Sequence, residues 1–365
     1  MSKVRIQSLK ISVAIVLALS VMAQAGEPVF TQALGPREWV FPGDHGRHDG
    51  FKTEWWYFTG NVREKETTRR FGYQLTFFRS AFVAKATTRP SGWGMTDLYF
   101  AHAAISDVEG KQFLYADRLA RGRRGLASSS DKRMDVVLKD WSAKMEAQTI
   151  RLVGGDAKFA INLTCQPGRG PILQGPGGLN AKGTKPGQAS YYYSMIRMPT
   201  HGTLNLAGRA FEVEGDSWMD HEFSSNALAE NQAGWDWLAL TLADGSDLMI
   251  YRLRDKSGRT DYLSGTRIDA KGNAHYLSAG EIELTPSKPW KNTTSGAIYP
   301  LRWSVKVAGM AAMVVKTRLA DQELQTPHST GVTYYEGTVS VADDKGAAMG
   351  EGYLEMTGYA GALPK

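Results

Sequence analysis

Short runs of alternating apolar and polar residues, separated by turns rich in glycine and charged residues, recur along most of the sequence. In residues 71–78, for example, Phe71, Tyr73, Leu75 and Phe77 fall on one side of an extended strand. Similar runs cover residues 96–106, 112–119, 134–139, 148–153, 157–164, 247–254, 260–268, 302–307, 310–319, 331–341 and 349–356. No window shows the apolar period of a sustained helix. The pattern predicts an all-β protein, a barrel or a sandwich.

The size of the chain and its cysteine content constrain the fold further. The chain has 365 residues, which corresponds to two domains of roughly 150 residues each. The single cysteine, Cys165, excludes an internal disulfide, so the fold must be stabilised by burial. The second half repeats the strand-and-turn pattern of the first. We therefore expect two similar β-domains, at residues 26–224 and 225–365.

The first 25 residues have the features of a signal peptide. Lys3, Arg5 and Lys10 precede a short apolar run at residues 11–22, and Ala23-Gln24-Ala25 matches a cleavage site. We expect cleavage after Ala25 and a soluble protein that is periplasmic or secreted, with no membrane-spanning segment in the mature chain. The net charge of +6 includes those three basic residues. Because the remaining basic residues are scattered, no nucleic-acid partner is expected.

An acidic residue stands at the start of a strongly aromatic strand. Residues 53–58 read Thr-Glu-Trp-Trp-Tyr-Phe, which places Glu54 on one face with Trp56 and Phe58, and Trp55 and Tyr57 on the other. A carboxylate on an aromatic face is costly to ionise unless it is paired. Glu54 is therefore either tied to a partner or available for proton chemistry.

Two further acids lie between aromatic residues near the expected domain junction. Asp220 follows Trp218 in Gly215–Phe223, and Asp236 stands between Trp235 and Trp237. An acid on an apolar face has a raised pKa and can stay protonated near neutral pH. His221 could orient such an acid or relay its proton.

Four segments together resemble one family: FPGDHGRHDGFKTEWWYFTGNV, ASYYYS, GDSWMDHEFSSN and GWDWLALTLADGSDLMIYRLR. They are similar to the AttH/carotenoid 1,2-hydratase-like family of secreted lipocalin-like proteins, often labelled "predicted secreted hydrolase". The resemblance covers essentially the whole mature chain. It implies two tandem lipocalin-like antiparallel β-barrel domains, with the signature motifs near their interface.

The resemblance also implies a function and a set of site residues. Family members include hydratases that add water to a terminal carotenoid double bond, so the expected activity is that of a hydro-lyase or isomerase on an isoprenoid or lipid-like alkene. Such a reaction needs an acid to protonate the alkene and aromatic faces to stabilise the cation. The expected catalytic residues are Glu54, Asp220, His221 and Asp236. The expected ligand-binding residues are Trp55, Trp56, Tyr57, Tyr192, Trp218, Trp235 and Trp237.

Other interpretations remain open. The chain could be a non-catalytic periplasmic carrier or chaperone of a hydrophobic ligand that works with an export-system partner. It could also be a secreted hydrolase, although it has no G-x-S-x-G motif. The aromatic residues could instead be core, with the acids accepting their hydrogen bonds. His45 and His48 have the spacing of a metal-binding pair, but a turn role is favoured, and we expect no metal and no cofactor. Residues 166–188, rich in glycine and proline, are expected to form a long mobile loop or a lid.

Overall fold

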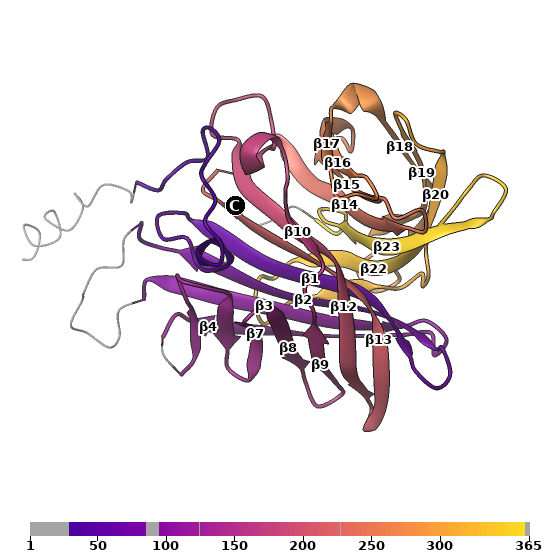
Figure 1. Cartoon of the computed structure of the whole chain (residues 1–365), viewed down its shortest axis with the longest axis horizontal. Helices are drawn as coiled ribbons and strands as arrows, with labels where there is room; N and C mark the ends of the chain where they lie inside the picture. The colour runs from indigo at the N-terminus through magenta and orange to yellow at the C-terminus, as the bar shows by residue number, and fades with distance from the viewer. Residues whose placement is uncertain (1–28, 85–94, 124, 227, 362–365) are drawn as a thin grey trace, which may run out of the picture.

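The computed structural model describes residues 29–84, 95–123, 125–226 and 228–361 and consists of two antiparallel β-sheets (Figure 1). The described residues contain no α-helix, only short 3₁₀ turns at η2 (Gly43–His45), η3 (Pro176–Gly178) and η4 (Ala279–Glu281). The all-β prediction is therefore confirmed. The expected signal peptide lies outside the described residues, and within them no helix is long and apolar enough to cross a membrane.

The first sheet has 13 strands in the order β4-β3-β2-β1-β13-β12-β9-β8-β7-β6-β5, with β10 and β11 added to β12. It curls so that β3 contacts β6 and β8, which makes a nearly closed barrel. Its strands are β1 (Thr53–Glu64), β2 (Arg70–Ala81), β3 (Asp97–Asp107), β4 (Gln112–Arg121), β5 (Ala127–Ser129), β6 (Asp135–Leu138), β7 (Trp141–Glu146), β8 (Thr149–Gly155), β9 (Phe159–Cys165), β10 (Arg169–Leu173), β11 (Leu179–Ala181), β12 (Ala189–Leu206) and β13 (Arg209–Ser224).

The second sheet has 10 strands in the order β17-β16-β15-β14-β23-β22-β20-β19-β18, with β21 added to β22. Its strands are β14 (Gln232–Leu242), β15 (Asp247–Asp255), β16 (Thr260–Ile268), β17 (Ala274–Leu277), β18 (Ile282–Lys291), β19 (Ile298–Val307), β20 (Met313–Thr317), β21 (Glu323–Gln325), β22 (Thr333–Ala342) and β23 (Ala348–Met356). In both sheets the first strand pairs with the last strand, β1 with β13 and β14 with β23.

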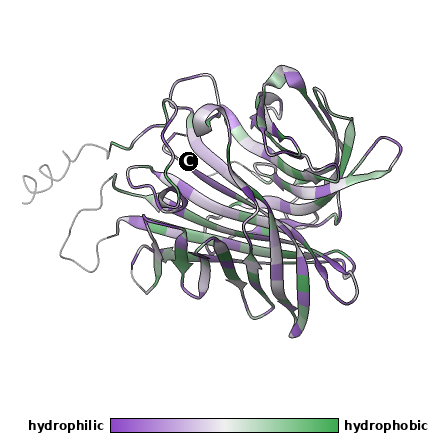
Figure 2. Ribbon diagram, viewed as in Figure 1, coloured by the Kyte–Doolittle hydropathy of each residue, from purple (hydrophilic) through white to green (hydrophobic). Residues whose placement is uncertain are grey.

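Each sheet encloses an apolar core of its own, and a third cluster lies where the sheets meet. Hydrophobic and hydrophilic residues alternate along many strands, as expected where the two faces meet different surroundings (Figure 2). Strands β1 and β2 pack on β23 and β22. The approach is close at Gly72, where a Cβ atom would lie 2.7 Å from the Cβ of Thr338. We call the layer between the sheets the seam.

The segment expected to be a mobile loop or a lid is in part β-strand. Residues 166–188 contain β10 and β11, which pair with β12. Gly170 and Pro171 lie within β10, and its register with β12 shifts there. The prolines of residues 286–300 lie in the β18–β19 hairpin, and Pro289 pairs with Pro300. Residues 203–213, whose sequence around Ala207-Gly208 predicts a hairpin, form one, with Leu206 opposite Arg209.

Candidate functional site

Strands β1 and β13 present their side chains to two different environments. Trp56 lies opposite His221, and Tyr57 lies opposite Asp220. Because successive side chains on a strand point to opposite faces, His221 faces the interior of the first sheet and Asp220 faces the seam. The two faces predicted for residues 54–58 are confirmed, since Trp56 and Phe58 belong to the interior core and Tyr57 to the seam cluster. Of the expected acids, Asp220 is therefore not in contact with His221.

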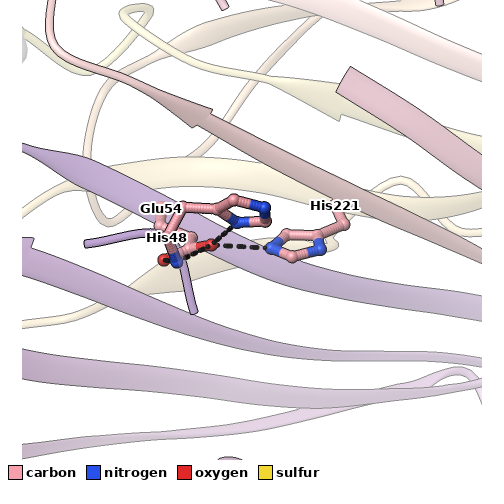
Figure 3. A group of neighbouring side chains, drawn as sticks. All are labelled: His48, Glu54 and His221. Carbon is pink, nitrogen blue, oxygen red and sulfur yellow. Dashed lines mark hydrogen bonds and ion pairs between the residues drawn. The ribbon is translucent and has the colours of Figure 1, made fainter. Parts of the chain in front are cut away.

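His221 is instead a partner of Glu54 (Figure 3). Oε1 of Glu54 lies 2.9 Å from Nε2 of His221 and 2.7 Å from Nδ1 of His48, and Oε2 accepts the His48 backbone N–H at 3.0 Å. The Arg79 guanidinium is 3.6 Å away. Burial raises the pKa of Glu54, but the hydrogen bonds from His221 and His48 outweigh it and hold that pKa well below its usual range. Glu54 is therefore a charged acceptor and a poor proton donor near neutral pH.

The same cluster brings three potential metal ligands together. One ligand atom from each of His48, Glu54 and His221 lies within 4.8 Å of the other two, and two histidines with a glutamate can bind zinc. In this structure, Nδ1 of His48 and Nε2 of His221 are both hydrogen-bonded to the Glu54 carboxylate. The Arg79 guanidinium also compensates the charge of Glu54. His45, the other histidine of the expected pair, turns to the Tyr193 hydroxyl at 2.6 Å. The cluster holds the η2 loop against β1 and β13, and the absence of a metal stays a prediction.

Asp236 occupies the position in the second sheet that Glu54 occupies in the first, on the first strand and opposite an arginine of the next. It faces the interior, away from Trp235 and Trp237, because β14 alternates. Its Oδ2 is 2.6 Å from Nη2 of Arg252 and 3.1 Å from Nε of Arg254. This double ion pair holds Asp236 in the interior, while Trp235 and Trp237 join the aromatic cluster on the other face of β14.

The seam gathers six of the seven expected ligand-binding residues. Tyr57, Tyr192, Trp218 and Trp237 are buried there, with Trp55 and Trp235 partly buried at its edge. The Trp237 ring contacts Tyr57 edge-on, with ring centroids 5.2 Å apart, and Trp218 at 6.5 Å. Trp56 is the exception, because it packs on His221 inside the first sheet.

Asp220 is the acid at the centre of this aromatic cluster. Its carboxylate accepts hydrogen bonds from Tyr192 Oη at 2.7 Å, Ser194 Oγ at 2.5 Å and Trp218 Nε1 at 2.7 Å. Burial raises the pKa of Asp220 to about 7 against the effect of these three neutral donors. Asp220 can therefore hold or release a proton at neutral pH.

The second sheet adds two carboxyl groups that the sequence interpretation missed. Glu355 of β23 lies opposite both Trp237 and Glu336. Trp235 Nε1 donates to Glu355 at 2.9 Å, and Tyr57 Oη donates to Glu336 at 2.8 Å. Burial raises the pKa of both glutamates. The alternation of residues 352–356, which puts Tyr353 and Glu355 on one face, was the available signal.

The edge of the seam contains an ion pair and unpaired polar atoms. Lys182, next to β11, lies 2.9 Å from Glu222 and over the Tyr251 ring. Oε1 of Glu336 and the Tyr353 hydroxyl are buried and make no hydrogen bond. A small cleft at one end of the seam, of about 30 Å³, is lined by residues that include Trp218 and Tyr353. A few polar atoms among aromatic side chains are a feature that ligand sites share.

Comparison with known proteins places the fold. The sequence profile of the AttH-like family matches residues 32–359. The crystal structure of an AttH protein from Nitrosomonas europaea is 32% identical, with a TM-score of 0.82 over 90% of this chain and 100% of that one. Kievitone hydratase from Nectria haematococca is 15% identical, with a TM-score of 0.67 over 92% and 97% of the two chains. CghA is 10% identical, with a TM-score of 0.52 over 91% and 97%. A search of curated proteins found no match.

Proposed function

We propose that this chain, which belongs to the AttH-like family, binds a hydrophobic alkene in the seam and hydrates or isomerises it by proton transfer from Asp220. The observation that carries the proposal is a buried carboxyl group that titrates near neutral pH within a layer of aromatic rings. The family match and the similarity in fold to kievitone hydratase, a hydratase by name, support this class of reaction.

The surroundings of Asp220 suit a proton donor. When it is protonated, it can transfer its proton to one alkene carbon and leave a tertiary cation on the other. The faces of Trp218, Trp237 and Tyr57 can stabilise that cation. The hydrogen bonds from Tyr192, Ser194 and Trp218 stabilise the carboxylate that remains. Water then captures the cation, or loss of a proton gives an isomer.

Glu54 and His221 have a different role in this proposal. Their hydrogen bond lies on the opposite face of β1 and β13, and Glu54 is held ionised. They are positioning residues that fix the two strands carrying Tyr57 and Asp220.

We also propose that the chain is exported and cleaved after Ala25. N-terminal sequencing of the protein from periplasmic and secreted fractions would test this proposal.

The first experiment is native mass spectrometry with lipid extraction of the exported protein. It is followed by incubation with geraniol and squalene in ¹⁸O-water. Wild type should add labelled water, and Asp220→Asn should bind the alkene but turn it over ~10²–10⁴-fold more slowly. Glu214→Gln, an exposed acid on the same strand, is the control.

Two results would count against this function. Unchanged turnover by Asp220→Asn would remove Asp220 as the donor. A co-purifying apolar ligand that wild type and variant both retain unaltered would favour a carrier, the non-catalytic alternative.

A further inference from the structure

We propose that Glu355 is a second catalytic group of the seam, the base that accepts a proton from the attacking water. This inference rests on the proposed function and assigns the second half of the same reaction. In this proposal both sheets contribute to the site: the first sheet provides Asp220 and the second provides Glu355.

The strand register places Glu355 close to the aromatic layer around Asp220. Glu355 lies directly opposite Trp237 on β14. Trp237 Nε1 donates to Tyr192 Oη at 3.2 Å, and Tyr192 Oη donates to Asp220. Glu355 thus pairs with the strand position whose side chain is joined to Asp220 through Tyr192. After burial, the charges of Glu222 and Asp220 are among the causes that raise the pKa of Glu355, which places its carboxyl group within electrostatic reach of Asp220.

Among the carboxyl groups of the seam, Glu355 is the one best placed to accept a proton from water. Glu222 is committed to Lys182 at 2.9 Å. Glu336 is fully buried, accepts a hydrogen bond from Tyr57 and is kept protonated by burial. Glu355 is only partly buried and accepts one side-chain hydrogen bond, from Trp235. It can therefore meet both the solvent and the interior of the seam.

The reaction balances with these two groups. The Asp220 carboxylic acid transfers its proton to an alkene carbon, which breaks the π bond and leaves a carboxylate and a tertiary cation. The water oxygen bonds to the cation, and the water proton passes to the Glu355 carboxylate. One molecule of water has then been added to the double bond. Proton exchange with solvent restores the protonated Asp220 and the ionised Glu355.

The first test needs no substrate. Dicyclohexylcarbodiimide is an apolar reagent that reacts with protonated carboxyl groups, and mass spectrometry identifies the modified residues. Burial raises the pKa values of Glu355 and Asp220 to about 7, so each is in part protonated near neutral pH. We expect both to be labelled there, and labelling of Glu355 to fall at higher pH as it ionises to the base form. Glu351, on the same strand but paired with Arg318 at 3.0 Å, is the internal control, as is the ion-paired Asp236. Labelling of Glu355 no greater than that of Glu351 would overturn the proposal.

The second test separates the two halves of the reaction. In D₂O with geraniol or squalene, Glu355→Gln should still exchange deuterium into the alkene through Asp220 but lose water addition by at least ~10²-fold. Asp220→Asn should lose both. If Asp220→Asn is inactive while Glu355→Gln hydrates at the wild-type rate, the role of Glu355 is wrong and the proposed function stands. If neither substitution changes the reaction, both proposals fail.

Discussion

Four buried acids of this protein form two pairs that differ in what faces them. Glu54 and Asp236 lie in the interiors of the two sheets, each on the first strand and directly opposite an arginine of the second, Arg79 or Arg252. Asp220 and Glu336 lie in the seam and accept hydrogen bonds from neutral hydroxyl or indole groups. Glu54 and Asp236 are therefore paired with arginines, whereas Asp220 and Glu336 have no cation as a partner in the described part of the chain and differ in this from Glu222, the seam acid that pairs with Lys182.

This difference separates structural acids from acids available for proton chemistry. A carboxylate beside a cation has a strong reason to stay ionised, whereas a buried carboxyl with neutral donors has a raised pKa. Asp220 and His221 are neighbours in sequence but belong to different groups, because the strand sends them to opposite faces. Burial alone, which these acids share, does not reveal a catalytic group.

The largest expected effect comes from removing an interior charge. Asp236→Asn leaves Arg252 and Arg254 buried without their anion, and we expect a loss of about 3–5 kcal/mol in unfolding free energy. Asp220→Asn removes no partner of a cation and should leave the unfolding free energy unchanged or higher. Urea denaturation of both variants at pH 7 provides the comparison. Equal destabilisation by the two substitutions would contradict the division into two groups.

The next effect is the pH dependence that Asp220 imposes. Burial raises the pKa of Asp220 from 3.8 to about 7, so between these values the unfolded chain releases a proton that the folded chain keeps. The contribution of Asp220 to stability therefore falls as pH rises from about 4 to about 7 and is constant above that. Asp220→Asn should gain up to about 4 kcal/mol relative to wild type over this interval. A difference that does not change with pH would mean that Asp220 is ionised throughout.

His102, a histidine of the seam, should lower the stability of the protein at acidic pH. Burial lowers the pKa of His102 from 6.5 to about 4. Its ring contacts the hydroxyls of Tyr334 and Ser329. The unfolded chain binds a proton below pH 6.5 that the folded chain refuses until about pH 4, so stability is lost as pH falls through that interval. His102→Gln should reduce this loss by about 3 kcal/mol in acid denaturation monitored by circular dichroism. An unchanged acid transition would show that His102 does not contribute to it.

The smallest expected effect tests a single bond across the seam. Tyr57→Phe removes the donor to Glu336 and should cost about 1–2 kcal/mol, since Glu336 is fully buried. The double variant Tyr57→Phe with Glu336→Gln should then be less destabilised than the sum of the single variants. Strict additivity in urea denaturation would mean that the two side chains do not interact in solution.

Local patterns in the sequence were enough to predict the class of fold and much of the aromatic layer. Alternation assigned Trp56 and Tyr57 to different faces. The aromatic residues around Asp220 and Asp236 in residues 218–237 were predicted to bind the ligand, and they lie in the seam. The partners could not be predicted, because they depend on pairing between distant strands. Glu54 meets His221 only through the β1–β13 register, and Glu355 meets Trp237 only through the β14–β23 register. Nothing local distinguishes an acid that will face an arginine from one that will face a tyrosine.

The pairing of first and last strands in each sheet also has a consequence for folding. Thr53 of β1 donates a hydrogen bond to Ser224 of β13, 171 positions later. The edge of β1 that does not pair with β2 therefore has no partner until nearly the whole first sheet has been synthesised. Such non-local contacts slow folding, and unpaired strand edges favour aggregation in the meantime. In the second sheet the strand that completes the pairing is β23, which carries Glu355. The seam is therefore completed last, and a chain that lacks β23 would have Asp220 and Trp237 but neither Tyr353 nor Glu355.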